Sequence, residues 1–68
     1  MDYLIEIESV NGPCWVNEDI PGDPGRTMQI ESAERYANER EARENLNAIE
    51  RKYFRRKYRI VAVDESSS

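Results

Sequence analysis

The sequence predicts a small α+β domain of ββαβ order, with one main helix packed on a three-stranded, largely antiparallel sheet. Three observations indicate this fold class. Residues 3–10 alternate between apolar and acidic, as in a half-buried strand. The stretch from Glu31 to Arg56 has a strongly helical composition. Residues 58–63 are apolar and rich in β-branched residues, which favour strands. We expect one domain over residues 1–64 and a flexible tail over residues 65–68.

The first two strands should form a hairpin. Asn11-Gly12 follows the first strand, and this dipeptide favours the positive φ values of a tight turn. A short second strand then begins at Cys14. Residues 17–27 are rich in glycine, proline and acidic residues and are expected to form a loop. Residues 26–30 are a candidate for another short extended piece.

The helical stretch should be interrupted near Asn38, because its apolar residues fall on two different faces. Ala33 and Ala37 share one face, and the second face lies about half a turn away. That second face carries Ala42, Leu46, Ile49 and Tyr53. Asn38 is a good N-cap, and Glu41 completes a capping box. We expect a short turn or 3₁₀ piece around residues 32–36 and a main helix from about Glu39 to about Arg55.

The expected core draws on every element. Its members are Tyr3, Ile5, Ile7, Val16, Leu46, Ile49, Tyr53, Ile60 and Ala62. In the last strand the alternative is that Val61 and Val63 point inward, since both faces of that strand are apolar. A chain of 68 residues buries only about 60% of its unfolded surface, so its stability should be marginal.

The composition favours a cytoplasmic protein. Cys14 is the one cysteine, so no intrachain disulfide can form. Glu6 and Glu8 interrupt the apolar residues near the N-terminus, which is unlike a signal peptide. No apolar stretch approaches the roughly 20 residues that span a bilayer.

The residues for a recognisable active site are absent. The chain has no histidine, which removes Ser-His-Asp and Cys-His catalysis. The loop from Asn17 resembles a calcium loop, but Pro21 and Met28 occupy positions that need oxygen ligands. We expect no enzymatic activity, no metal and no cofactor.

Charge is unevenly distributed along a chain whose net charge is −4. Residues 51–59 carry six cations with aromatic residues between them, which suits contacts with phosphates and bases. The cations are Arg51, Lys52, Arg55, Arg56, Lys57 and Arg59. A second interpretation is that they complement the helix C-terminus and the acidic surface of the chain itself. The acidic overall balance is unlike a dedicated nucleic-acid-binding domain.

The acidic first half offers a different candidate binding surface. Its acidic members are Glu18, Asp19, Asp23, Glu31 and Glu34. Trp15 lies close to this loop in the sequence, where it serves either as a core anchor or as an exposed binding residue. Carboxylates spaced in this way could imitate phosphates in front of a basic channel.

The layout resembles a loose group of small proteins from phages and mobile elements. The motifs are Trp15-Val16, Thr27, the segment Ala33-Glu34-Arg35-Tyr36, Ala42, and the closing strand. Several anti-CRISPR proteins are similar in size and acidity. The resemblance implies an inhibitor that occludes a nuclease or its nucleic-acid-binding channel, and it supplies no catalytic residues.

Two functional hypotheses follow, and a third concerns assembly. The first is a non-enzymatic, phage-encoded inhibitor that blocks a host defence complex of CRISPR-Cas type with its acidic face. The alternative is a small nucleic-acid-binding or regulatory protein that uses residues 51–59. The third is a structural protein that self-associates, for example as a homodimer, through a free edge on the second strand.

Overall fold

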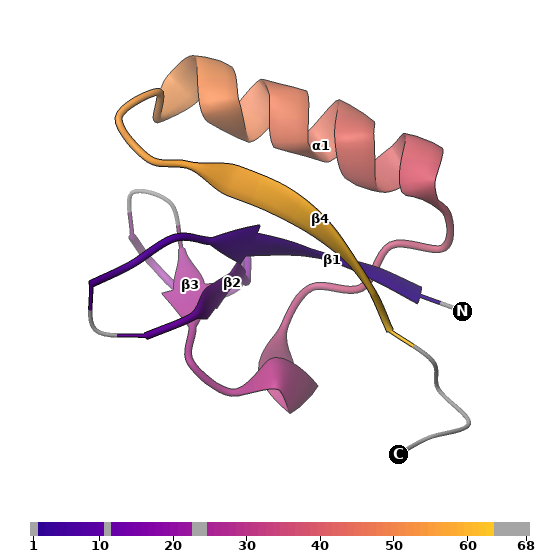
Figure 1. Cartoon of the computed structure of the whole chain (residues 1–68), viewed down its shortest axis with the longest axis horizontal. Coiled ribbons are helices and arrows are strands. Elements are labelled where there is room, and N and C mark those ends of the chain that lie inside the picture. The colour runs from indigo at the N-terminus through magenta and orange to yellow at the C-terminus, as the bar shows by residue number, and fades with distance from the viewer. Residues whose placement is uncertain (1, 11, 23–24, 64–68) are drawn as a thin grey trace.

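A computed structural model describes residues 2–10, 12–22 and 25–63 of the chain. The elements follow the order β1 (Asp2–Ile7), β2 (Cys14–Val16), β3 (Arg26–Thr27), the 3₁₀ turn η1 (Ile30–Ser32), α1 (Glu39–Lys52) and β4 (Tyr58–Val63). All strand pairs are antiparallel, and the strands lie in the order β3-β2-β1-β4. The α+β class with one helix packed against a sheet is confirmed (Figure 1). The sheet has four strands rather than three, because Arg26–Thr27 pairs with β2.

The first hairpin is looser than the sequence predicted. β1 ends at Ile7, which pairs with Cys14, so residues 8–13 form the connection. A two-residue turn would place Pro13 opposite Val10, and proline has no N–H to donate to that pair. Asn11 lies outside the described residues. Gly12 has a φ of 112°, a value that glycine adopts without steric cost.

Helix α1 begins where its capping residues predict. The Asn38 side chain accepts a hydrogen bond from the Glu41 backbone N–H at 2.9 Å. The Glu41 carboxylate in turn accepts from the Ala37 N–H at 3.2 Å. The helix ends at Lys52, before the expected Arg55, because Tyr53 leaves helical geometry with φ −129° and ψ 66°. The Tyr58 hydroxyl donates to the freed Tyr53 carbonyl at 2.8 Å and stabilises this end.

The segment before the helix extends the sheet instead of forming a 3₁₀ turn around residues 32–36. The 3₁₀ turn comes earlier, at Ile30–Ser32. Tyr36 then pairs with Tyr3 through two backbone hydrogen bonds of 3.0 and 2.9 Å. The short strand β2 has already ended at this level, so Tyr36 satisfies backbone groups of β1 that would otherwise lack a partner.

The main core lies between α1 and the sheet. Its buried members are Ile5, Ile7, Cys14, Val16, Tyr36, Ala42 and Leu46. Tyr3, Ile49 and Ile60 are partly buried against them, as expected for core residues. Two expectations need correction. Tyr53 is only half-buried at the margin, and Ala62 is exposed because its single methyl group lies on the outermost strand.

The opposite face of the sheet also buries apolar surface. Leu4 is fully buried although it does not belong to the helix-side cluster. Its cross-strand partner is Val61, and alternation along the strands places Trp15 on the same face. Ala33, which follows η1, is buried as well. Figure 1 shows η1 and α1 on opposite sides of the sheet.

The two faces of β4 settle the alternative left open by the sequence. Ile60 pairs with Ile5 and lies on the helix side, whereas Val61 and Val63 lie on the opposite side. Both valines are half-buried there. Each face of this strand therefore covers apolar neighbours, which explains why the sequence pattern was ambiguous.

The edges of the sheet are β3 and β4. The expected free edge on the second strand is wrong, because β2 lies between β1 and β3. The expected tail, residues 65–68, lies outside the described residues. In the part of the chain that the structure describes, no helix has the length and apolar character needed to cross a membrane.

Candidate functional site: an acidic loop beside a groove

Asn17 organises the loop that follows β2. Its side-chain amide donates to the Ser32 carbonyl at 2.7 Å, and its Oδ1 accepts from the Asp19 N–H at 2.9 Å. The Asn17 backbone N–H donates to the Gly25 carbonyl at 3.0 Å, and the Asn17 carbonyl accepts from the Ile20 N–H at 3.3 Å. One asparagine thus joins both ends of the loop to the η1 segment.

A second contact holds the η1 segment against β2. The Glu34 N–H donates to the Val16 carbonyl at 2.8 Å. Together with the Asn17–Ser32 hydrogen bond, this contact joins two stretches that are separate in sequence, residues 17–20 and 30–34. Both stretches carry acidic residues that the sequence singled out.

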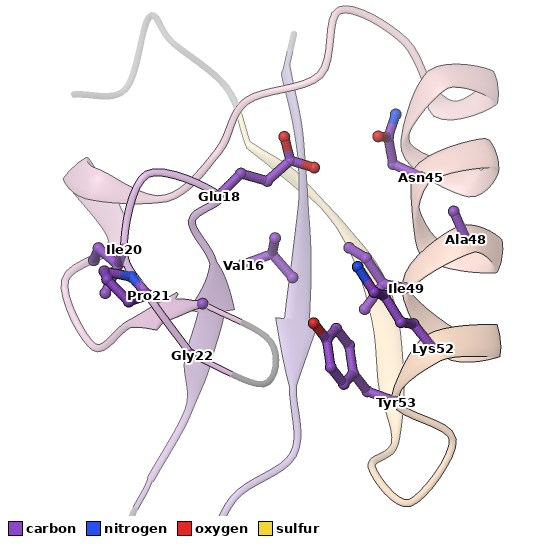
Figure 2. Close-up of a pocket in the computed structure, with 11 residues that line it drawn as sticks. Val16, Glu18, Ile20, Pro21, Gly22, Asn45, Ala48, Ile49, Lys52 and Tyr53 are labelled. Carbon is purple, nitrogen blue, oxygen red and sulfur yellow. The ribbon is translucent and has the colours of Figure 1, made fainter.

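A groove of about 410 Å³ separates this loop from helix α1. Its apolar lining includes Val16, Ile20, Pro21, Ala48, Ile49 and Tyr53. Glu18 lines it from the loop and Lys52 from the helix. Figure 2 shows Val16 between the loop residues on one side and the helix residues on the other. The groove therefore has an apolar lining with one carboxylate and one ammonium group beside it.

Two carboxylates lie within electrostatic reach of the Tyr36 phenol. Burial is the main cause that raises the pKa of Tyr36 to about 12, and the carboxylates of Glu18 and Glu34 raise it further. The Tyr36 hydroxyl is buried and has no hydrogen-bond partner among the described residues. The side chains of Glu18 and Glu34 therefore lie on the same side of the molecule, both within electrostatic reach of Tyr36.

We expect Tyr36→Phe to change stability by less than about 1 kcal/mol at pH 7, because the buried hydroxyl it removes makes no hydrogen bond. The wild-type chain should lose stability as pH rises from about 10 to 12, because the unfolded tyrosine ionises before the folded one. The variant should lack this part of the slope. Urea unfolding across this pH range measures both effects, and a loss above 2 kcal/mol at pH 7 would contradict the first.

The structure joins the two segments that carry four of the predicted acidic residues. Glu18, Asp19 and Glu31 are exposed, and Glu34 is half-buried. None of these four belongs to the ion pairs found among the described residues. Asp23 lies outside the described residues. Trp15 is not an exposed binding residue, because it is partly buried on the sheet face opposite the helix and its indole N–H is buried there.

The basic segment forms the end of the molecule around the turn from α1 to β4. Arg59 is neutralised by Glu6 at 2.7 Å. The other five cations belong to none of the ion pairs found in the described ranges; they are Arg51, Lys52, Arg55, Arg56 and Lys57. Phe54 is 74% exposed beside them. Lys52, Tyr53, Phe54, Arg55 and Arg56 line a shallow concavity of about 490 Å³.

The described residues offer no converging metal ligands. No group of three or more cysteine, aspartate or glutamate side chains among them could hold a metal ion. Cys14 is buried in the helix-side core, with its sulfur 3.8 Å from the Gly12 carbonyl. This placement agrees with a packing role for the thiol.

Sequence reasoning missed the groove because it treated residues 17–27 only as a solvated loop. The helix sequence contained part of the information needed to predict the groove. At 100° per residue, Asn45, Ala48 and Lys52 lie beside Ile49 on one side of the buried stripe. Small and amphipathic side chains at these positions are compatible with a groove. Nothing in the sequence pattern showed that Ile20 and Pro21 would face that side of the helix.

Comparison of the chain with family models, with curated proteins and with solved structures found no match. The candidate surfaces therefore rest on their own geometry.

Proposed function

We propose that this chain is a non-enzymatic, phage-encoded inhibitor that binds a protein complex of the host cytoplasm. Its acidic surface would occupy a basic, nucleic-acid-binding surface of a defence complex of CRISPR-Cas type. The observation that carries the proposal is the joining of two acidic segments by the Asn17–Ser32 and Glu34–Val16 hydrogen bonds. The acidic surface is defined here as Glu18, Asp19, Glu31 and Glu34.

Two physical features support this use of the acidic surface. Its carboxylates sit on segments that are already held by hydrogen bonds, so binding orders little additional chain. Ile20 and Ile30 lie in the same two segments and are 38% and 40% exposed. Apolar contacts could then supply binding energy, while the carboxylates speed association with a basic partner and set its orientation.

Charge reversal tests the acidic surface. The tagged chain would be used to capture proteins from nuclease-treated lysate of the host cells. We expect a discrete protein complex to be retained by the wild type and lost by the triple variant Glu18→Lys, Asp19→Lys, Glu31→Lys. All three side chains are exposed, so the variant should remain folded.

A matched control reverses three other exposed carboxylates, Glu8, Glu39 and Glu44. It has the same net charge as the acidic-surface variant and should retain the complex. Equal retention by both variants would contradict the role of the acidic surface. Capture of no complex by the wild type would contradict the proposal itself.

The second candidate function is nucleic-acid binding through the basic end. The exposed Phe54 favours it, because an aromatic ring among cations suits base stacking beside phosphates. We expect binding of a labelled single strand to be detectable at about 50 mM salt and to weaken steeply as salt rises. The variant Arg55→Glu, Arg56→Glu should abolish it. The control variant Arg35→Glu, Arg40→Glu, which reverses two other exposed arginines, should not. Absence of binding at about 50 mM salt would remove this candidate.

A further inference from the structure

The outer edge of β4 is the long unpaired edge of the sheet. β4 has six residues, whereas the opposite edge strand, β3, has two. Natural sheets commonly protect their edges with short strands, prolines, bulges or charges. β4 contains no proline, and its one charged residue, Arg59, is bound by Glu6. This strand therefore has little protection against pairing with another strand.

The ladder with β1 shows which backbone groups face outward. The Glu8 N–H donates to the Lys57 carbonyl at 2.9 Å, so the adjoining pair of Ile7 and Tyr58 is a non-hydrogen-bonded pair. Alternation along the ladder directs the N–H and C=O groups of Tyr58, Ile60 and Ala62 away from β1. The described residues offer these outward groups no backbone partner. They form a regular set of three free donors and three free acceptors.

Pairing of β4 with a second copy has one favourable register. In an antiparallel pair centred on Ile60, Tyr58 lies opposite Ala62 of the other copy, and Arg59 lies opposite Val61. This register pairs all three outward residues of each strand, whereas a centre at Arg59 or at Val61 pairs only two of them. A centre at Arg59 would also place two arginines directly opposite each other, which is destabilising. The outward groups of Ile60 would then bond to those of the same residue in the partner.

The positions of the α1 helices in the two copies are compatible with this pairing of β4 strands. Helix α1 packs against both β1 and β4. Strands lie about 4.8 Å apart, and the two-fold axis passes midway between the two Ile60 residues. Two helices that each lie over the space between β1 and β4 would therefore be about two strand spacings apart. That separation, about 10 Å, is the usual distance between packed helices. The two helices would run antiparallel across the joint sheet.

The side of α1 that faces the outer edge of β4 is exposed and carries both a positively and a negatively charged residue. Arg43, Asn47 and Glu50 lie on the side of the buried stripe opposite the groove. Glu50 lies within electrostatic reach of Tyr58. Burial is the main cause that raises the pKa of Tyr58, Arg56 lowers this pKa, and the Glu50 carboxylate raises it. Ile60 lies about 7 Å farther along the strand. That distance corresponds to between about four and five helical residues, so the axis lies level with about Leu46.

Positions equally far from Leu46 in the two directions meet across such an axis. Arg43 lies three residues before Leu46 and Glu50 four residues after it, a mismatch of about 1.5 Å along the helix axis. Each arginine would therefore lie near the glutamate of the other helix, and it would exchange its exposed ion pair with Glu39 for this contact. We propose that this chain forms a symmetric homodimer in which β4 pairs with β4 of a second copy and Arg43 faces Glu50 across the paired helices. The groove and the acidic surface lie on the β2 side of each copy, so both remain accessible.

Charge exchange between the two helix positions tests the proposal. We expect sedimentation equilibrium of the full chain to give twice the 8.0 kDa chain mass at micromolar concentration. Arg43→Glu and Glu50→Arg should each raise the dissociation constant by about tenfold, equivalent to about 1.4 kcal/mol. The double variant should restore dimerisation, because it exchanges the charges within each pair.

A second pair of variants tests the strand separately. Ala62→Pro removes an outward N–H that the ladder with β1 does not use, so it should leave the monomer folded by circular dichroism and abolish dimerisation. Ala62→Ser keeps the N–H and should dimerise normally. A monomeric wild type at every concentration would overturn the proposal. A dimer insensitive to Arg43→Glu, Glu50→Arg and Ala62→Pro would overturn this interface.

Discussion

Leu46→Ala is expected to cost about 2–5 kcal/mol of unfolding free energy. Leu46 is the large apolar residue that α1 buries in the helix-side core, where only 8% of it is exposed. Truncation removes its contacts with the sheet and leaves a cavity that a short helix cannot close. A domain of this length has about 3–10 kcal/mol of stability in total. The variant should therefore be largely unfolded near the melting temperature of the wild type.

Urea unfolding followed by circular dichroism measures this loss. The matched control is Asn47→Ala, which changes the exposed neighbour in the same helix and should shift stability by less than about 0.5 kcal/mol. Comparable stability of the Leu46 and Asn47 variants would show that α1 does not carry the core. The helix-side packing described above would then be wrong.

Gly25→Ala is expected to have the second-largest effect, because it disrupts the loop behind the acidic surface. A β-carbon at Gly25 would collide with the backbone carbonyl oxygen of Ile20 and lie 2.5 Å from that of Asn17. Neither oxygen belongs to a flexible side chain, so the backbone itself must shift. We expect a cost of about 1–3 kcal/mol, as for other overpacked sites. Partner capture should fall together with stability, because Asn17 holds both acidic segments.

Gly22→Ala is the control for the loop, since Gly22 is exposed in the same segment. It should leave both thermal stability and partner capture near the wild-type level. A Gly25→Ala variant that captures the partner normally would show that the loop geometry does not matter for binding. The acidic surface could then act only through its net charge.

The sequence predicted those elements in which local pattern and packing agree. Asn38 and Glu41 located the start of α1, because capping depends on neighbouring residues alone. The alternation of Tyr3, Ile5 and Ile7 correctly indicated the helix-facing side of β1. These features need no knowledge of how distant segments meet.

The errors arose where long-range pairing decided the structure. Tyr36 pairs with Tyr3 across more than thirty residues, and no local signal distinguishes this extended residue from a 3₁₀ turn. Leu4 was not predicted as a core residue, because the alternation along β1 marks only the helix-facing side, whereas Leu4 is buried on the second face. β2 was expected at an edge because the two-residue strand β3 is too short to give a periodic pattern.

In the candidate site, too, local sequence identified residue types, whereas long-range contacts decided which residues meet. Sequence identified the acidic residues by type, and the structure joined Glu18 to Glu34 through contacts of Asn17 and Val16. The position of Trp15 on the opposite face follows from its register with Glu6, which composition could not reveal. The unpaired edge of β4 depends on strand order and likewise required the structure.

Competition for nucleic acid tests the central claim most directly. The host complex captured after nuclease treatment would be incubated with a labelled oligonucleotide, and the chain would then be titrated in while fluorescence anisotropy is recorded. We expect the wild type to displace the oligonucleotide and the variant Glu18→Lys, Asp19→Lys, Glu31→Lys to leave it bound. A ternary complex, with the oligonucleotide still bound at saturating chain, would contradict occupation of the nucleic-acid-binding surface.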